Sequence, residues 1–411
     1  MTDWESLSKQ LKALGVEWGK DRRPAQPRQV KYPIHAVVPG RFWEVIDGPV
    51  FCHEEHYPKD HLHGSKPIWP HNPIQILCQW ANADSLSRAD LGNFIFLDTE
   101  TSGLAGGTGT YAFEIGVGRF TDEGFYLAQF FMRHPGEEAA LLAALSEFVD
   151  GLQAVVTYNG KSFDIPLLNT RYTMMGLSSP FETVAHFDLL PLARRLWRIR
   201  LESRTLANVE SHILGVRRGE QEVPGYMIPE LYFEYLRSQD ARPLGGVFYH
   251  NAIDILSLAG LFSHMAYLLH EPYATSITHP EDVVALAWFF EAMGDIARAK
   301  ALYQQALAGK LPPELRSDAR SKLSFLLKRN EHWDQAVALW ERAAENNEMY
   351  AFEELAKYYE HRAKDLATAH QWASRAKHTL ASSGLPAYQV QQWSQALDHR
   401  LARLNRKLSH K

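Results

Sequence analysis

Residues 94–120 read FIFLDTETSGLAGGTGTYAFEIGVGRF, and this stretch decides the fold of the chain. It contains two runs of β-branched and aromatic residues on either side of a glycine-rich turn. A third run, FYLAQFFMR at residues 125–133, follows an Asp-Glu-Gly turn. Runs of this composition, bounded by turn residues, predict three consecutive strands that pair as a meander.

Helix and strand patterns alternate after the meander. EEAALLAALSEFV (137–149) predicts a helix and AVVTY (154–158) a short buried strand. FDIPLLNTRYTMMG (163–176) predicts an amphipathic helix that follows a turn at Asn159-Gly160. The resulting order, βββαβα, favours an α/β domain with a mixed sheet flanked by helices.

The organisation of the chain is read in three parts. With 411 residues, the chain exceeds what one hydrophobic core usually organises. Residues 1–85 are rich in Pro, Trp and His and are expected to form short strands and loops. The α/β domain is expected at residues 86–275, and residues 280–411 carry helical patterns without a strand signal.

A repeated segment marks the helical part. AKALYQQA (Ala299–Ala306) recurs as AVALWERA (Ala336–Ala343) and as AHQWASRA (Ala369–Ala376). Each copy has Ala, a large apolar residue and Ala at positions i, i+3 and i+7, the face along which helix pairs stack in tetratricopeptide-like arrays. An ordinary helical bundle is the alternative. Such a domain is expected to dock a protein partner or to position a substrate.

Composition restricts the remaining classes. We find no apolar run of the roughly 20 residues that span a bilayer, and the start MTDWESLSKQL is not an export signal, so we expect a cytoplasmic protein without membrane contact. Two cysteines are too few for a disulfide framework. The net charge of −5 is uninformative, because nucleases that hold metals with clustered acids can be acidic overall.

Four acidic residues form the strongest chemical signal. Asp98 and Glu100 lie two apart at the end of a predicted strand, so their side chains share one face. Asp164 falls at the strand-to-helix turn after AVVTY, where ligand sites form at a sheet edge. His250 and Asp254 stack on one face of a late apolar helix. Converging carboxylates repel one another unless cations offset the charge, and Mg²⁺ and Mn²⁺ prefer such oxygen ligands.

The order Asp-x-Glu, Asn-x3-Phe-Asp, and His or an aromatic residue before a final Asp resembles the DEDD exonucleases of the RNase H-like superfamily. The stretch DTETSGLAGGTGTYAFEIGVG is similar to the YprB-type branch, over about residues 93–265. The resemblance implies that two divalent ions are held by four residues: Asp98, Glu100, Asp164 and Asp254. Two metals across a scissile phosphate stabilise charge on the attacking and leaving oxygens.

The general base departs from the family pattern. One DEDD subgroup has Tyr four positions before the last Asp, and another has His five positions before it. Here His250 is four before and Tyr249 five before Asp254. We favour His250, because this spacing faces it toward the metals and histidine titrates near neutral pH. Tyr249 remains open if the helix begins only after Asn251.

Substrate contacts are expected around the first two motifs. Glycines of the loop at 103–110 would let backbone N–H groups approach a phosphate, although a flexible turn is the alternative. In LARRLWRIRLESR, arginines surround Trp197, and we interpret this residue as a stacking platform for an unpaired base beside phosphate-binding cations. The residues expected to bind substrate are Thr99, Gly106, Gly107, Asn159, Phe163, Arg194 and Arg195.

Two other groups are given structural readings. Asp188 lacks an acidic partner two or four residues away and is interpreted as structural. The N-terminal region contains five Cys and His side chains of the types that bind zinc. Their spacing matches no zinc finger, so we do not favour a metal site there. The five residues are Cys52, His53, His56, His61 and His63.

The sequence therefore predicts a metal-dependent 3′–5′ exonuclease acting on single-stranded DNA or RNA. A non-catalytic nucleic-acid-binding scaffold is the first rival, and the intact set of four acids speaks against it. A phosphoesterase acting on small nucleotides is the second, because the same metals and acids would serve it.

Overall fold

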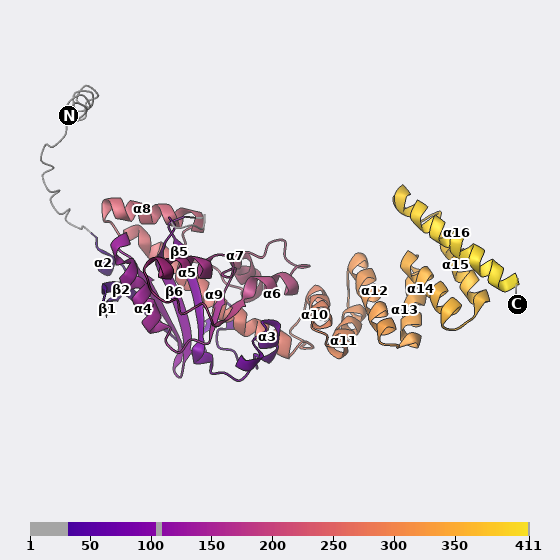
Figure 1. The fold of residues 1–411 in the computed structure, drawn as a ribbon, viewed down its shortest axis with the longest axis horizontal. Coiled ribbons are helices and arrows are strands. Elements are labelled where there is room, and N and C mark those ends of the chain that lie inside the picture. The colour runs from indigo at the N-terminus through magenta and orange to yellow at the C-terminus, as the bar shows by residue number, and fades with distance from the viewer. Residues whose placement is uncertain (1–31, 104–108, 410–411) are drawn as a thin grey trace, which may run out of the picture.

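The computed structural model describes residues 32–103 and 109–409. A seven-stranded sheet with flanking helices is followed by a run of helices that extends away from it (Figure 1). The strands of the sheet are β1 (Arg41–Val45), β2 (Gly48–Pro58), β5 (Phe94–Thr101), β6 (Ala112–Thr121), β7 (Gly124–Phe131), β8 (Ala154–Thr157) and β9 (Ala185–Asp188).

The sheet is mixed and has the order β1-β2-β7-β6-β5-β8-β9. Strands β5, β6 and β7 form the predicted antiparallel meander, while β8 and β9 run parallel to β5. The predicted fold class, a mixed sheet with flanking helices followed by a helical part, is confirmed. Strands β1 and β2, from the segment that the sequence set apart, extend this sheet because β2 pairs with β7 along most of its length.

Shorter elements connect the strands and cover the sheet. They include the hairpin β3 (Leu62–His63) and β4 (Lys66–Pro67), and one-turn helices at Asp84–Leu86, Leu91–Asn93, Pro135–Glu137, Gly225–Met227 and Arg242–Leu244. The π-helical turn η4 spans Glu210–Leu214. The α-helices are α2 (Ile34–Val37), α3 (Gln75–Trp80), α4 (Glu138–Phe148), α5 (Asp164–Met174), α6 (Leu189–Leu196), α7 (Leu206–Val209), α8 (Ile228–Ser238) and α9 (Gly245–His270).

The two faces of β5 pack into different cores because side chains alternate along a strand. Phe94 and Phe96 join the core that contains most of the buried face of α9. Ile95 and Leu97 join the core that contains α4. The next residues of the first series are Asp98 and Glu100, so the strand parity turns these two carboxylates toward α9.

Helix α9 is the central core helix. With its preceding turn it spans Arg242–His270, and its most apolar 18 residues have a mean hydropathy of 1.6, which is high enough for a bilayer span. The expectation that no run would be long and apolar enough was therefore wrong for this segment. In the structure, 78% of that apolar window is buried inside the fold, where α9 packs against β5 and β6.

The helical part consists of successive paired helices. The repeated segments fall in α11, α13 and α15, and their first and last alanines are all buried against neighbouring helices. Small side chains at these positions let the helices approach closely. The helices are α10 (Pro280–Ala292), α11 (Ile296–Ala308), α12 (Pro313–Arg329), α13 (Trp333–Glu345), α14 (Met349–His361), α15 (Leu366–Leu380) and α16 (Ala387–Ser409).

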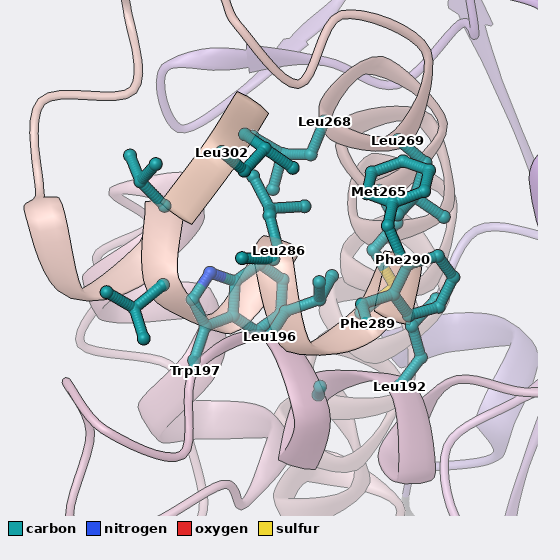
Figure 2. Close-up of a cluster of buried hydrophobic side chains, with 14 of the residues drawn as sticks. Leu192, Leu196, Trp197, Met265, Leu268, Leu269, Leu286, Phe289, Phe290 and Leu302 are labelled. Atoms are coloured by element: carbon teal, nitrogen blue, oxygen red, sulfur yellow. The ribbon is translucent and has the colours of Figure 1, made fainter. Parts of the chain in front are cut away.

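An apolar cluster joins the sheet-containing part to the helical part. Figure 2 shows Trp197 with Leu192 and Leu196 of α6 beside residues of α9 and α10, including Phe289 and Phe290. Trp197 is only 1% exposed. The interpretation of Trp197 as a stacking platform for bases was therefore wrong: its apolar ring is buried in this junction.

Candidate functional site

The first two carboxylates are supplied by the far end of β5. Pairing of β5 with the parallel strand β8 ends at Phe96, whereas pairing with β6 continues beyond it. Asp98 and Glu100 therefore project past the end of β8, on the α9 side of the sheet. Glu100 stands opposite Glu114 of β6, which is fully buried.

The third carboxylate comes from the loop after β8. Asp164 is the first residue of α5, and its Oδ1 accepts a hydrogen bond of 2.6 Å from Thr99 Oγ1. Asn159 adopts a left-handed φ of 70°, and a Cβ on Gly160 would meet Thr157 Oγ1 at 2.5 Å. This tight turn directs the chain from β8 back to the end of β5.

Asp188 fixes the same loop. Its Oδ1 accepts the backbone N–H of Asn159 at 2.7 Å, its Oδ2 that of Lys161 at 3.3 Å, and it also caps α6 through the N–H of Leu190. Every one of these contacts is to the backbone, which agrees with the structural reading of Asp188.

Helix α9 contributes the fourth carboxylate and two neighbours. Asn251 is fully buried and donates through Nδ2 to Asp98 Oδ2 at 3.0 Å. The Nε2 atom of His250 lies 3.5 Å from Asp254 Oδ2 and 3.9 Å from Glu100 Oε1. Because α9 begins at Gly245, residues 250 and 254 share a helical face, as the spacing predicted.

A segment between η4 and α8 adds Arg218 and Glu222 to the site. Arg218 forms ion pairs with Asp254, with Glu222 at 2.8 Å and with Glu210 at 2.5 Å. Glu222 Oε1 also lies 2.7 Å from His250 Nδ1. No local sequence pattern links this irregular segment to the acids, so neither residue was predicted as part of the site.

Burial dominates the electrostatics of the four acids. Desolvation raises the pKa of Asp98 well above its usual range, and the charges of Asp254 and Asp164 raise it further. The pKa of Glu100 is raised in the same way by burial and then by Asp98 and Glu114. Burial also raises the pKa values of Asp164 and Asp254. The cluster therefore resists holding four negative charges without additional cations.

The acids are not gathered into a finished coordination shell. Among the residues that the structure describes, no group of three or more His, Cys, Asp or Glu side chains is close enough together to hold a metal ion. Protein groups occupy the carboxylates instead: Asn251 for Asp98, Thr99 for Asp164, and Arg218 for Asp254.

A cavity of about 370 Å³ adjoins Asp164. Thr99, Gly103 and Phe163 are among its lining residues, and Phe163 is 57% exposed although its ring is apolar. Of the expected substrate contacts, Thr99 and Phe163 therefore lie together beside Asp164, whereas Asn159 is not among the residues that line this cavity. Gly106 and Gly107 lie outside the described residues.

The basic stretch is only partly available. Arg194 and Arg195 are exposed in the last turn of α6, about 9–10 Å along that helix from Asp188, which caps its other end. No contact joins them to the described acids. Arg200 pairs with Asp282 at 3.2 Å, and Arg204 donates to backbone carbonyls.

The N-terminal cysteine and histidines are spread over different contacts. Cys52 is buried in the sheet core, and His53 contacts Glu55 Oε1 at 3.0 Å. His63 Nε2 lies 2.8 Å from Ser257 Oγ of α9. They do not converge on one point in the described part of the chain.

Two fully buried amide side chains, Gln129 and Asn251, also support the acids although no local sequence pattern predicted them. Gln129 of β7 donates to Asn251 Oδ1 at 3.0 Å and to Glu114 Oε1 at 2.9 Å, so it supports the amide that orients Asp98. A Cβ at Gly116 would lie 1.9 Å from Asn251 Oδ1. Gly116 in EIGVG was a usable signal, because a side chain at this position would collide with Asn251 of α9.

The antiparallel meander, joined on one side by parallel strands and carrying acids at the end of its first strand β5, defines a protein of the RNase H-like class, which is a nuclease-type fold. A family model described as the RNase H superfamily matches residues 95–266. RNase H-like nucleases typically use divalent metal ions.

A protein of Bacillus subtilis (strain 168), described as uncharacterized protein YprB, is 34% identical over 371 residues, which are 87% of this chain and 86% of that protein. The chain therefore belongs to the YprB-type branch of the RNase H-like superfamily. A family B DNA polymerase from the archaeon Pyrobaculum calidifontis matches with a TM-score of 0.34 and 16% identity, over 51% of this chain and 28% of the polymerase chain.

Proposed function

We propose that this chain is a metal-dependent 3′–5′ exonuclease that hydrolyses phosphodiester bonds of single-stranded DNA or RNA. The observation that carries the proposal is the set of four largely buried carboxylates from β5, α5 and α9, whose pKa values are all raised. Burying such acids together costs free energy in the absence of cations, which a site for divalent ions would offset.

The donor set fits hard divalent cations. Carboxylate oxygens of Asp98, Glu100, Asp164 and Asp254 would hold two ions, Mg²⁺ or Mn²⁺. When bound, the ions would supply charge stabilisation for the attacking and leaving oxygens of the phosphate. The protein contributes orientation: Asn251 holds Asp98 and Thr99 holds Asp164 before any ion arrives.

His250 is the proposed general base. Its Nε2 faces Glu100 and Asp254, which suits a side chain that takes a proton from water beside the acids. The Tyr249 hydroxyl instead accepts the backbone N–H of Gly219 at 2.7 Å. The alternative Tyr249 required a helix that begins only after Asn251, whereas α9 begins at Gly245.

The cavity beside Asp164 is the proposed place for the terminal nucleotide. The exposed ring of Phe163 offers a face on which a base can stack, and Thr99 lines the same cavity. Asn159, in the turn before Phe163, is proposed to contact the substrate as well. The proposal includes backbone contacts from the loop with Gly106 and Gly107. Arg194 and Arg195 would bind phosphates further along the strand.

The helical part is proposed to bind a protein partner or to position the nucleic acid. Its paired helices with buried small residues are the support for a tetratricopeptide-like array, a fold that presents extended binding surfaces. We also propose that the protein acts in the cytoplasm.

The decisive experiment is degradation of end-labelled single-stranded DNA and RNA with Mn²⁺ or Mg²⁺. The native protein is compared with Asp98→Asn, which keeps the shape of the side chain, and with an EDTA control. The proposal is supported by a ladder of products shortened from the 3′ end that is absent with Asp98→Asn and absent with EDTA. Binding without cleavage would favour the non-catalytic scaffold. Cleavage restricted to mononucleotides or dinucleotides would favour the small-nucleotide phosphoesterase.

A further inference from the structure

Arg218 occupies the carboxylate that the proposed metal site needs. Its Nη2 atom bonds Asp254 Oδ1, while its Nε and Nη2 atoms hold Glu210 at 2.5 and 2.9 Å. Its side chain is 13% exposed, as is that of Asp254. The guanidinium is therefore a buried cation already in place against one of the four acids.

The anchor of Arg218 is more deeply buried than its contact with the site. The side chain of Glu210 is 2% exposed and also accepts a hydrogen bond of 2.7 Å from Ser257. An arginine guanidinium is not deprotonated in proteins, so Arg218 remains a cation in this buried position. Because Glu210 has no route to solvent, its ion pair with Arg218 is the harder one to break.

We infer that Arg218 is the internal counter-cation of the metal-free site, and that it competes with a divalent ion for Asp254. This inference rests on the proposed function. A guanidinium and a metal ion repel each other and share one carboxylate poorly. Binding of a divalent ion therefore requires Asp254 to release Arg218, which keeps its ion pair with Glu210.

Arg218 also connects the proposed metal ligand Asp254 to the proposed base His250. The same arginine donates to Glu222 Oε1 at 2.8 Å, and this oxygen lies 2.7 Å from His250 Nδ1. When Asp254 is released, Arg218 remains in the network that holds the imidazole.

Titration calorimetry with Mn²⁺ alone tests the inference without measuring activity. Arg218→Gln is compared with the double variant Arg218→Gln/Glu210→Gln, which keeps the net charge and removes the uncompensated buried glutamate. Arg217→Gln is the matched control, because Arg217 is the exposed neighbouring arginine. We expect Mn²⁺ affinity to rise about tenfold in both Arg218 variants and to change less than about twofold in the control.

The outcomes separate this inference from the proposed function. Wild-type binding that is lost in Asp98→Asn but unchanged or weaker in both Arg218 variants overturns the role of Arg218 and leaves the metal site standing. Absence of Mn²⁺ binding in every protein, including both Arg218 variants, overturns the metal site and the inference together. If Arg218→Gln alone fails to fold, the charge-neutral double variant decides.

Discussion

Glu222 Oε1 lies 2.7 Å from His250 Nδ1, although the two residues are 28 positions apart. Arg218 Nη1 lies 3.2 Å from the same ring nitrogen, but a guanidinium only donates. We assign the Nδ1 proton to the shorter, charge-assisted bond with Glu222. The Nε2 lone pair then faces Glu100 and Asp254, as a base requires.

Replacing His250 separates the two candidate bases. His250→Gln is expected to lower kcat by roughly 10²- to 10⁴-fold, the usual contribution of a general base. Tyr249→Phe is expected to keep most activity, because the tyrosine hydroxyl bonds a backbone N–H away from the acids. Single-turnover cleavage of labelled DNA measures both. A larger loss in Tyr249→Phe would reverse the assignment.

Asp98→Asn is expected to abolish cleavage and to stabilise the metal-free protein. The pKa of Asp98 is raised in the folded state. Its contribution to the free energy of unfolding is therefore fully present below the ordinary pKa of 3.8 and is lost as the pH rises through the raised pKa. The variant avoids that loss. At pH 8 we expect a gain of about 1–3 kcal/mol, the scale of an uncompensated buried polar group.

Chemical denaturation at pH 8 and pH 5, with EDTA, measures this difference. The advantage of Asp98→Asn over wild type should shrink at the lower pH, and saturating Mn²⁺ should reverse it at pH 8. If the variant is no more stable than wild type at pH 8, then the charged form of Asp98 does not destabilise the folded protein.

Phe163→Ala is expected to raise KM for single-stranded substrate by about 5- to 150-fold, which corresponds to the loss of one stacking contact of roughly 1–3 kcal/mol. The ring is 57% exposed, so folding should be little affected. Ile46→Ala, at a position that is 99% exposed, is the matched control. An effect on kcat alone would argue against base stacking.

Arg194→Ala/Arg195→Ala tests the proposed path of the strand. Loss of two phosphate contacts to a single strand should reduce the slope of log K against log salt by about 1.4. Lys310→Ala/Lys364→Ala removes the same charge from exposed positions of the helical part. Fluorescence anisotropy over a salt series compares them, and equal slopes in both variants would exclude the path.

Trp197→Ala is expected to lower the free energy of unfolding by about 3–5 kcal/mol, because it empties a fully buried aromatic position. The junction in Figure 2 depends on this ring. Urea titration followed by circular dichroism gives the value. Unchanged stability with weaker nucleic-acid binding would restore the stacking role that the structure removes.

Local patterns determined most of the fold and the identity of the acids. Alternation along residues 94–100 predicted both the strand and the shared face of Asp98 and Glu100, since a strand has a two-residue period. Helical spacing did the same for His250 and Asp254. In each case the relevant geometry lies within one element, where sequence separation translates directly into position.

Tertiary structure alone decided what surrounds those acids. Arg218 and Glu222 reach the site from an irregular segment, and no sequence pattern carries information on such a long-range approach. Asn251 comes from a buried helix face, and its one sequence signal is Gly116, the small residue against which it packs. The interpretation of Trp197 was wrong for the same reason, because an aromatic residue among arginines gives the same sequence pattern whether it faces solvent or a neighbouring helix. The sequence by itself determined the carboxylates; the packing of α9 against the sheet determined their partners and their burial.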